Sequence, residues 1–197
     1  MESKPMSDFQ QSEVIKLFAD IMDELKIEYA IGGSIASSIY GTPRFTQDAD
    51  ITVQLSSSVA EQLYEKIKDR FYISKEAMYQ AIRSQSSFNV IHFETAFKLD
   101  IFPADSDFKK LILSRSKKNK IEESVNKSFS LVSPEDIVLL KLDWYKQSDC
   151  VSDRQWSDII GVLSVQKKSL DYKYLKTWSA NLGLNDFLQK AISESNI

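Results

Sequence analysis

Two aspartates separated by a single residue are the most informative chemical feature of the sequence. Asp48 and Asp50 occupy positions i and i+2 of a segment in which polar and apolar residues alternate. This alternation predicts a β-strand with both carboxylates on one face. Carboxylates so close repel one another unless a cation lies between them, and Mg²⁺ prefers oxygen ligands of this kind. The pair therefore indicates a metal site, with two solvated turn carboxylates as the alternative.

A third carboxylate lies in a second predicted strand. Asp100 alternates with apolar neighbours in segment 97–102, which follows segment 88–94 after a brief turn and predicts a β-hairpin. If this strand pairs beside that of Asp48, three carboxylates converge on one sheet edge, an arrangement that holds two metal ions. Lys98 projects on the same side as Asp100 and is either a phosphate ligand or a solvated charge at the strand edge.

The glycines of the chain are concentrated at one place. Only 5 of the 197 residues are glycine, yet Gly32, Gly33 and Gly41 fall within ten residues of each other. Gly32-Gly33-Ser34 follows a short apolar run and begins a predicted helix. Glycines let the backbone approach an anion, and the N–H groups of a helix start can bind a phosphate. A plain tight turn is the alternative interpretation.

Hydrophobic periodicity predicts the elements that position these residues. Ser133 followed by Pro134 is a strong signal for a helix start, after which the chain is helical throughout. We therefore expect an α/β (α+β) core over residues 1–132 with a mixed sheet flanked by helices, and a helical C-terminal extension over residues 133–197. Helices are predicted at 12–25, 34–40, 57–70, 75–82, 107–114, 152–163, 170–182 and 185–192, and strands at 27–31, 48–55, 71–73, 88–94, 97–102 and 127–132.

Composition excludes several classes of protein. The net charge of -3 is too balanced for general attraction to nucleic acid or to an anionic membrane. The single cysteine, Cys150, and the single histidine, His92, exclude an internal disulfide framework and a Cys/His zinc site. We expect His92 to be a core or edge residue of the hairpin. No apolar signal segment or membrane span is recognisable, which predicts a cytoplasmic protein without a membrane partner.

Three segments together resemble the nucleotidyltransferase superfamily, whose best-known branch is DNA polymerase β. They are Gly32-Gly33-Ser34, the segment from Arg44 to Ile51 with its two aspartates, and Lys98-Leu-Asp100-Ile-Phe. Within the superfamily the chain resembles small bacterial proteins grouped near AbiEii-type toxins, through segments 133–137, 141–142 and 154–159. The resemblance covers about residues 29–158 and implies a nucleotidyltransferase-type sheet.

The resemblance also implies a reaction. It is the Mg²⁺-dependent transfer of a nucleoside monophosphate from a nucleoside triphosphate to a hydroxyl acceptor, with release of pyrophosphate. The acceptor would be a tRNA end, a protein or a small molecule. Asp48 and Asp50 would hold two Mg²⁺ ions, for which Mn²⁺ can substitute, and Asp100 would hold the ion nearest the acceptor hydroxyl.

The same resemblance assigns nucleotide-binding residues. Gly32, Gly33 and Ser34 would hold the outer phosphates, and a basic residue is expected near the triphosphate. Its candidates are Arg44, Lys98 and Lys141. For Lys141 the alternative is a helix-surface lysine that extends to solvent.

A run of six cations within twelve residues is the other feature with a possible partner. It either follows the backbone of an RNA acceptor or forms a solvated helix end. The run comprises Lys109, Lys110, Arg115, Lys117, Lys118 and Lys120.

A non-catalytic module of the same fold, which binds a partner protein as in a toxin–antitoxin pair, is the alternative function. Three clustered acids favour catalysis over this alternative, because an inert scaffold does not need them.

Overall fold

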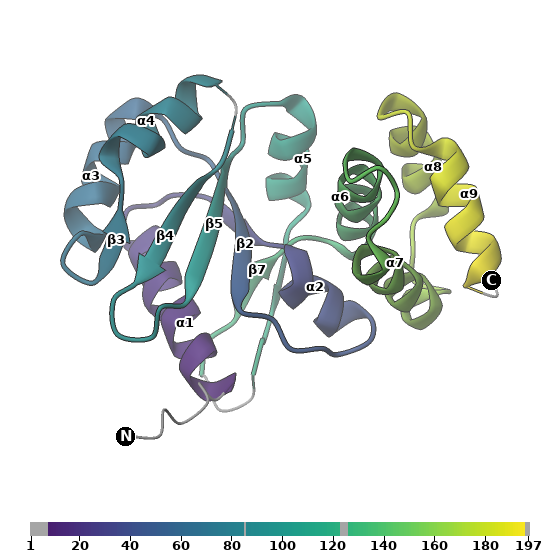
Figure 1. The fold of residues 1–197 in the computed structure, drawn as a ribbon, viewed down its shortest axis with the longest axis horizontal. Coiled ribbons are helices and arrows are strands. Elements are labelled where there is room, and N and C mark those ends of the chain that lie inside the picture. Colours follow the sequence, from purple (N-terminus) through teal and green to yellow (C-terminus); the bar gives the residue numbers. More distant parts are fainter. Residues whose placement is uncertain (1–7, 85, 123–125, 196–197) are drawn as a thin grey trace. The chain divides into compact units, whose positions relative to one another are not determined.

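The computed structural model describes residues 8–84, 86–122 and 126–195. The chain forms two compact units, which we describe separately (Figure 1). The first contains the described residues up to Ile31 together with Gln47–Leu131, and the second contains Gly32–Thr46 together with the described residues from Val132 onward. Residues 32–46 thus group with the C-terminal helices, although the sequence alone placed them in a core of residues 1–132.

A mixed seven-stranded sheet forms the centre of the first unit, in the order β3-β4-β5-β2-β1-β7-β6. The pairs β2/β5 and β1/β7 are parallel and the other neighbours are antiparallel. This confirms the predicted α/β class with a mixed sheet and the predicted hairpin. The strands are β1 (Tyr29–Ile31), β2 (Asp48–Val53), β3 (Phe71–Ile73), β4 (Phe88–His92), β5 (Lys98–Pro103), β6 (Lys117–Asn119) and β7 (Phe129–Leu131).

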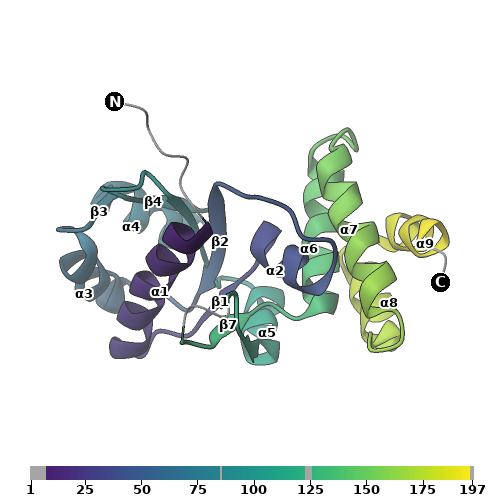
Figure 2. The same ribbon diagram turned by 90° about the horizontal axis from the view of Figure 1, so that it is seen from below.

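The first unit also contains helices that pack against its sheet and against each other, and Figure 2 shows them from a second direction. Helix α1 contacts α3, α4 packs against β4 and β5, and α5 packs against β1 and β2. The apolar positions of the alternating strands, such as Ile51 and Leu99, are buried in this core. Each such side chain contributes about 1.5–3 kcal/mol to stability. The helices are α1 (Asp8–Glu24), α3 (Ser57–Ile67), α4 (Lys75–Ser84) and α5 (Asp107–Arg115).

The second unit is helical in its described part. As the sequence predicts, α6 begins at Pro134, and the Ser133 side chain caps it by accepting a hydrogen bond from the Asp136 backbone N–H. The helices of the second unit are α2 (Gly33–Tyr40), α6 (Pro134–Gln147), α7 (Asp153–Gln166), α8 (Tyr172–Asn181) and α9 (Asn185–Glu194).

His92, in the first unit, is a buried hairpin residue, with Nδ1 3.0 Å from the Thr95 hydroxyl.

Gly41 lets the end of α2 approach α7 closely. A Cβ atom at this position would lie 2.7 Å from the Val162 backbone nitrogen and 2.8 Å from the Gly161 carbonyl carbon. Only glycine therefore fits at the contact. The approach holds the loop that follows α2, which carries Arg44, next to α7.

Strand β6 is the element that the sequence did not predict. Its residues Lys117–Asn119 are all exposed, and lysine and asparagine are poor strand formers. The strand forms because its backbone pairs with β7 in antiparallel register.

None of the helices in the described ranges is long and apolar enough to cross a membrane.

Candidate active site

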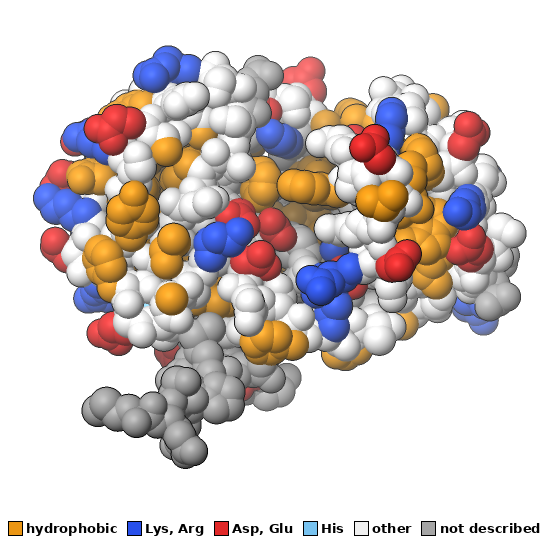
Figure 3. Space-filling view, in the orientation of Figure 1, with side chains coloured by type: hydrophobic (Ala, Val, Ile, Leu, Met, Phe, Trp, Pro, Cys, Tyr) orange, Lys and Arg blue, Asp and Glu red, His pale blue; other side chains and the backbone are white. Residues whose placement is uncertain are grey.

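The register of β2 and β5 brings the predicted acids together. Asp48 lies opposite Lys98, and Asp50 lies opposite Asp100. Residues two apart on a strand share a face, as do residues directly opposite on paired strands, so all four side chains project from one face of the sheet. Figure 3 shows acidic side chains beside a basic one over β2 and β5. We call Asp48, Asp50 and Asp100 the acidic cluster.

Lys98 contacts two members of the acidic cluster. Its ammonium nitrogen lies 2.7 Å from Asp100 Oδ2 and 3.8 Å from Asp48 Oδ2. The hydrogen bond to Asp100 raises the pKa of Lys98 above its usual value, and the charges of Asp48 and Asp50 act in the same direction against partial burial. Lys98 is therefore fully protonated at neutral pH and is a counter-ion of the cluster.

The acidic cluster suits a divalent cation by its donor type. It offers carboxylate oxygens, and Mg²⁺ is usually held by one or two carboxylates together with substrate phosphates. Among the described residues, no group of three or more His, Cys, Asp or Glu side chains is already arranged to hold a metal ion. In this structure the Lys98 ammonium contacts both Asp48 and Asp100. Ligation of a metal therefore requires these side chains to rearrange.

The backbone conformation explains why a glycine stands at the start of α2. Gly33 has a φ of 54°, in the left-handed region that residues with a Cβ atom disfavour, and α2 begins there after Gly32. Ser34 follows within the first turn of α2. The N–H groups of this turn and the positive end of the helix dipole favour an anion. The geometry thus forms the predicted turn and also suits a phosphate.

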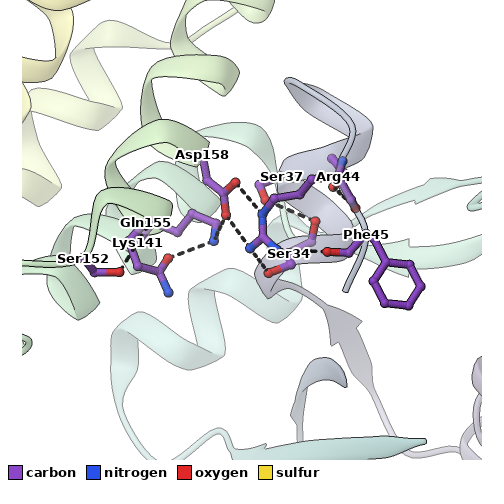
Figure 4. Close-up of polar contacts among 9 residues, drawn as sticks. Ser34, Ser37, Arg44, Phe45, Lys141, Ser152, Gln155 and Asp158 are labelled. Carbon is purple, nitrogen blue, oxygen red and sulfur yellow. Dashed lines mark hydrogen bonds and ion pairs between the residues drawn. The ribbon is translucent and has the colours of Figure 1, made fainter. Parts of the chain in front are cut away.

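Arg44 and Ser34, both predicted to bind phosphate, lie in one hydrogen-bonded network (Figure 4). Arg44 Nε donates to Asp158 Oδ1 over 2.8 Å, and Arg44 Nη2 donates to Asp158 Oδ2 over 2.9 Å. Arg44 Nη2 also donates to the Ser34 hydroxyl oxygen. A two-pronged pairing of guanidinium with carboxylate is strong and directional, so it fixes the Arg44 side chain beside Ser34.

Lys141 joins the same network from α6. It is buried, and its ammonium donates to Asp158 Oδ2 over 2.7 Å and to Gln155 Oε1 over 2.9 Å. The interpretation of Lys141 as a helix-surface lysine that extends to solvent is therefore wrong. Arg44, Lys141 and Asp158, with the hydroxyl of Ser34, form what we call the Asp158 network.

Asp158 is the residue of the network that the sequence did not single out for a role. Burial by itself raises the pKa of its carboxyl, but the hydrogen bonds from Arg44 and Lys141 outweigh burial and hold the pKa below its usual range. Two cations therefore share one ionised carboxylate. The available signal was the position of Asp158 four residues before the apolar Val162, which places both on one face of an amphipathic helix, and a buried acid requires a cationic partner.

The run of six cations extends from α5 through β6 to Lys120 in the first unit, so it is not one helix end. Lys109 lies 3.1 Å from the Asp105 carboxylate. The Lys118 ammonium lies 5.6 Å from the centre of the Tyr29 ring, within the range of a cation–π contact. Residues 117–119 are exposed. The β6 part of the run is therefore accessible to a partner, whereas Lys109 already has a counter-ion.

No protein-family model matches the sequence, and no curated protein sequence matches it. The fold, however, is similar to solved structures over almost the whole chain. An antigenic nucleotidyltransferase-like protein from Paracoccidioides brasiliensis has 20% identity and a TM-score of 0.58, covering 96% of this chain and 95% of its own. The antibiotic-resistance factor ANT(2'')-Ia has 13% identity and a TM-score of 0.56, covering 95% of this chain and 96% of its own.

A second structure of ANT(2'')-Ia, in complex with adenylyl-2''-tobramycin, has 16% identity and a TM-score of 0.53. It covers 87% of this chain and 96% of its own. Together these likenesses show that the chain has a nucleotidyltransferase fold. They do not distinguish the AbiEii-type branch, which stays a prediction from the sequence.

Proposed function

We propose that the protein is a Mg²⁺-dependent nucleotidyltransferase that transfers a nucleoside monophosphate from a nucleoside triphosphate to a hydroxyl acceptor and releases pyrophosphate. The observation that carries the proposal is the register of β2 and β5, which puts Asp48, Asp50 and Asp100 on one face of the sheet. The nucleotidyltransferase fold supports it independently.

In this proposal the acidic cluster holds the metal ions. Asp48 and Asp50 would hold the two ions, and Asp100 would hold the ion nearest the acceptor hydroxyl. When bound, Mg²⁺ supplies charge neutralisation for the triphosphate and lowers the pKa of the acceptor hydroxyl. Mn²⁺ offers the same oxygen-ligand chemistry.

The phosphate-binding groups are assigned from the sequence resemblance. The backbone around Gly32 and Gly33 and the hydroxyl of Ser34 bind the outer phosphates, and Arg44 provides positive charge. Lys141 is a positioning residue in this scheme, because its buried ammonium contacts Asp158 and thereby supports the carboxylate that orients Arg44.

The proposed reaction is an in-line displacement at phosphorus. The acceptor oxygen bonds to the α-phosphorus while the bond from that phosphorus to the oxygen bridging to the β-phosphate breaks. Pyrophosphate leaves with the electron pair, and the hydroxyl proton is lost to solvent. The protein contributes by positioning the reacting groups and by offsetting negative charge.

The acceptor class follows from two different observations. The exposed lysines of β6, Lys117 and Lys118, favour an RNA acceptor such as a tRNA end. The similar ANT(2'')-Ia has been solved with adenylyl-2''-tobramycin, which favours a small hydroxylated acceptor. A protein acceptor completes the classes that an assay must include.

A transfer assay tests the proposal. Purified protein is incubated with Mg²⁺, with each α-labelled nucleoside triphosphate in turn, and with total RNA or cell lysate as acceptor. We expect label from at least one nucleotide to be transferred. The Asp100→Asn variant should lose transfer but nearly retain Mg–nucleotide affinity, because its metal acts mainly in the transition state.

Two further variants complete the assay. Asp48→Asn should weaken nucleotide binding and transfer together, since Asp48 would hold the metal ion that accompanies the triphosphate. The control is Asp69→Asn, which removes an exposed acid of the same unit that lies outside the cluster. Folded protein that transfers no nucleotide to any acceptor contradicts the proposal and favours a non-catalytic module with a partner protein.

A further inference from the structure

Lys98 contacts two carboxylates of the acidic cluster, to which we assign the metal ions. Its ammonium lies within ion-pair distance of one oxygen of Asp100 and one oxygen of Asp48. These carboxylates come from different strands, and Lys98 lies directly opposite Asp48 in the β2/β5 register. The contact is therefore built into the sheet and does not depend on a loop conformation.

The ammonium and a divalent cation compete for the same oxygens. A metal ion bound to Asp48 and Asp100 must break the contacts of Lys98, and it then stands close to a positive charge that repels it. The Lys98 side chain can leave, because it is 37% exposed and its four-carbon stem is flexible. Once displaced, the ammonium needs a new anionic partner.

We propose that Lys98 is an internal counter-ion that competes with the divalent metal while no nucleotide is present, and that its ammonium pairs with the nucleotide phosphates once the metal is bound. This inference rests on the metal-binding part of the proposed function. Its consequence is ordered loading. The metal binds weakly to the free protein and tightly together with the nucleoside triphosphate, which brings the negative charge that Lys98 then contacts.

The first test is the affinity for Mn²⁺ without nucleotide, measured by calorimetric titration. Lys98→Met removes the charge and keeps an unbranched side chain, so the variant should bind Mn²⁺ about two- to fivefold more tightly, the range expected for a partly exposed ion pair. Lys98→Arg keeps the charge and should bind Mn²⁺ like the wild type.

A matched lysine of the same unit provides the control. Lys75 lies 2.7 Å from Glu61, the same distance as Lys98 from Asp100, and its side chain is 39% exposed. Lys75→Met should leave the Mn²⁺ affinity unchanged, because Lys75 contacts no member of the acidic cluster in this ion pair.

The second test is the affinity for a nonhydrolysable nucleoside triphosphate at saturating Mg²⁺. Here Lys98→Met should bind the nucleotide about two- to fivefold more weakly, because the ammonium that contacts the phosphates is gone. The same substitution thus has opposite effects on the two affinities. A purely structural role for Lys98 would lower both.

The outcomes separate this inference from the proposed function. Equal or weaker Mn²⁺ binding by Lys98→Met, with wild-type binding that Asp48→Asn abolishes, overturns the inference and leaves the metal site standing. Absence of Mn²⁺ binding from both the wild type and Lys98→Met overturns the inference together with the metal site. If Lys98→Met binds both Mn²⁺ and the nucleotide more tightly, the proposed pairing of the Lys98 ammonium with the nucleotide phosphates is wrong.

Discussion

Replacing Asp158 by asparagine removes the carboxylate on which Arg44 and Lys141 converge. The side chains of Asp158 and Lys141 are each only 4% exposed, whereas that of Arg44 is 26% exposed. The asparagine amide keeps the size of the side chain but carries no charge. Lys141 is then left as a buried ammonium without its ionised partner, while Arg44 can turn toward water.

The magnitude of the effect follows from burial. Removing one partner of a buried ion pair costs about 3–5 kcal/mol, and the lost pairing with the more exposed Arg44 adds little to this cost. We expect the free energy of unfolding to fall by about 3–5 kcal/mol, a large part of the roughly 5–15 kcal/mol typical of a folded protein. At about 2–4 °C per kcal/mol for a chain of this size, Tm should fall by about 6–20 °C.

Urea unfolding and calorimetry of the wild type and Asp158→Asn measure this loss. The control Glu61→Gln removes the carboxylate from the exposed pair with Lys75 and should leave stability nearly unchanged. Lys141→Met in the Asp158→Asn background should recover part of the loss, because the buried ammonium that lost its carboxylate is also removed. A loss in Asp158→Asn no larger than in Glu61→Gln would refute the reasoning.

Three further predictions concern acid, packing and RNA. Because the folded pKa of Asp158 lies below its ordinary value of 3.8, its stabilisation is present above that pH and is lost as the pH falls through the folded pKa. The free energies of unfolding of the wild type and Asp158→Asn should therefore converge as the pH is lowered below 3.8, and a difference that stays constant with pH would contradict the ionised state of Asp158. Gly41→Ala forces a Cβ atom against the α7 backbone and should lower the free energy of unfolding by about 1–3 kcal/mol in thermal unfolding, whereas no change would contradict the close contact. If RNA is the acceptor, Lys117→Glu should weaken its binding and reduce the slope of log affinity against log salt by about one unit, and an unchanged slope would identify β6 as a solvated face.

The sequence by itself determined most of the elements. Strand β2 was predictable because its polar and apolar residues alternate, and the i, i+2 spacing of Asp48 and Asp50 alone places both on one face. The start of α6 was predictable because the cap Ser133 and the first-turn Pro134 act within one turn. These features are local, so they need no knowledge of distant partners.

The tertiary structure decided how the candidate groups are paired. Arg44 and Asp158 are 114 positions apart, and their contact depends on the close approach of α2 and α7 at Gly41. The sequence around Lys141 is compatible with a lysine that extends to solvent and with a buried one. Only the packing of α6 against α7 places the buried carboxylate of Asp158 beside it. Strand β6 likewise forms because its backbone pairs with that of β7, although its own residues have low strand propensity. Local sequence patterns specify which face of a helix or strand a side chain occupies. The ion pairs between distant residues form only where folding brings their segments into contact.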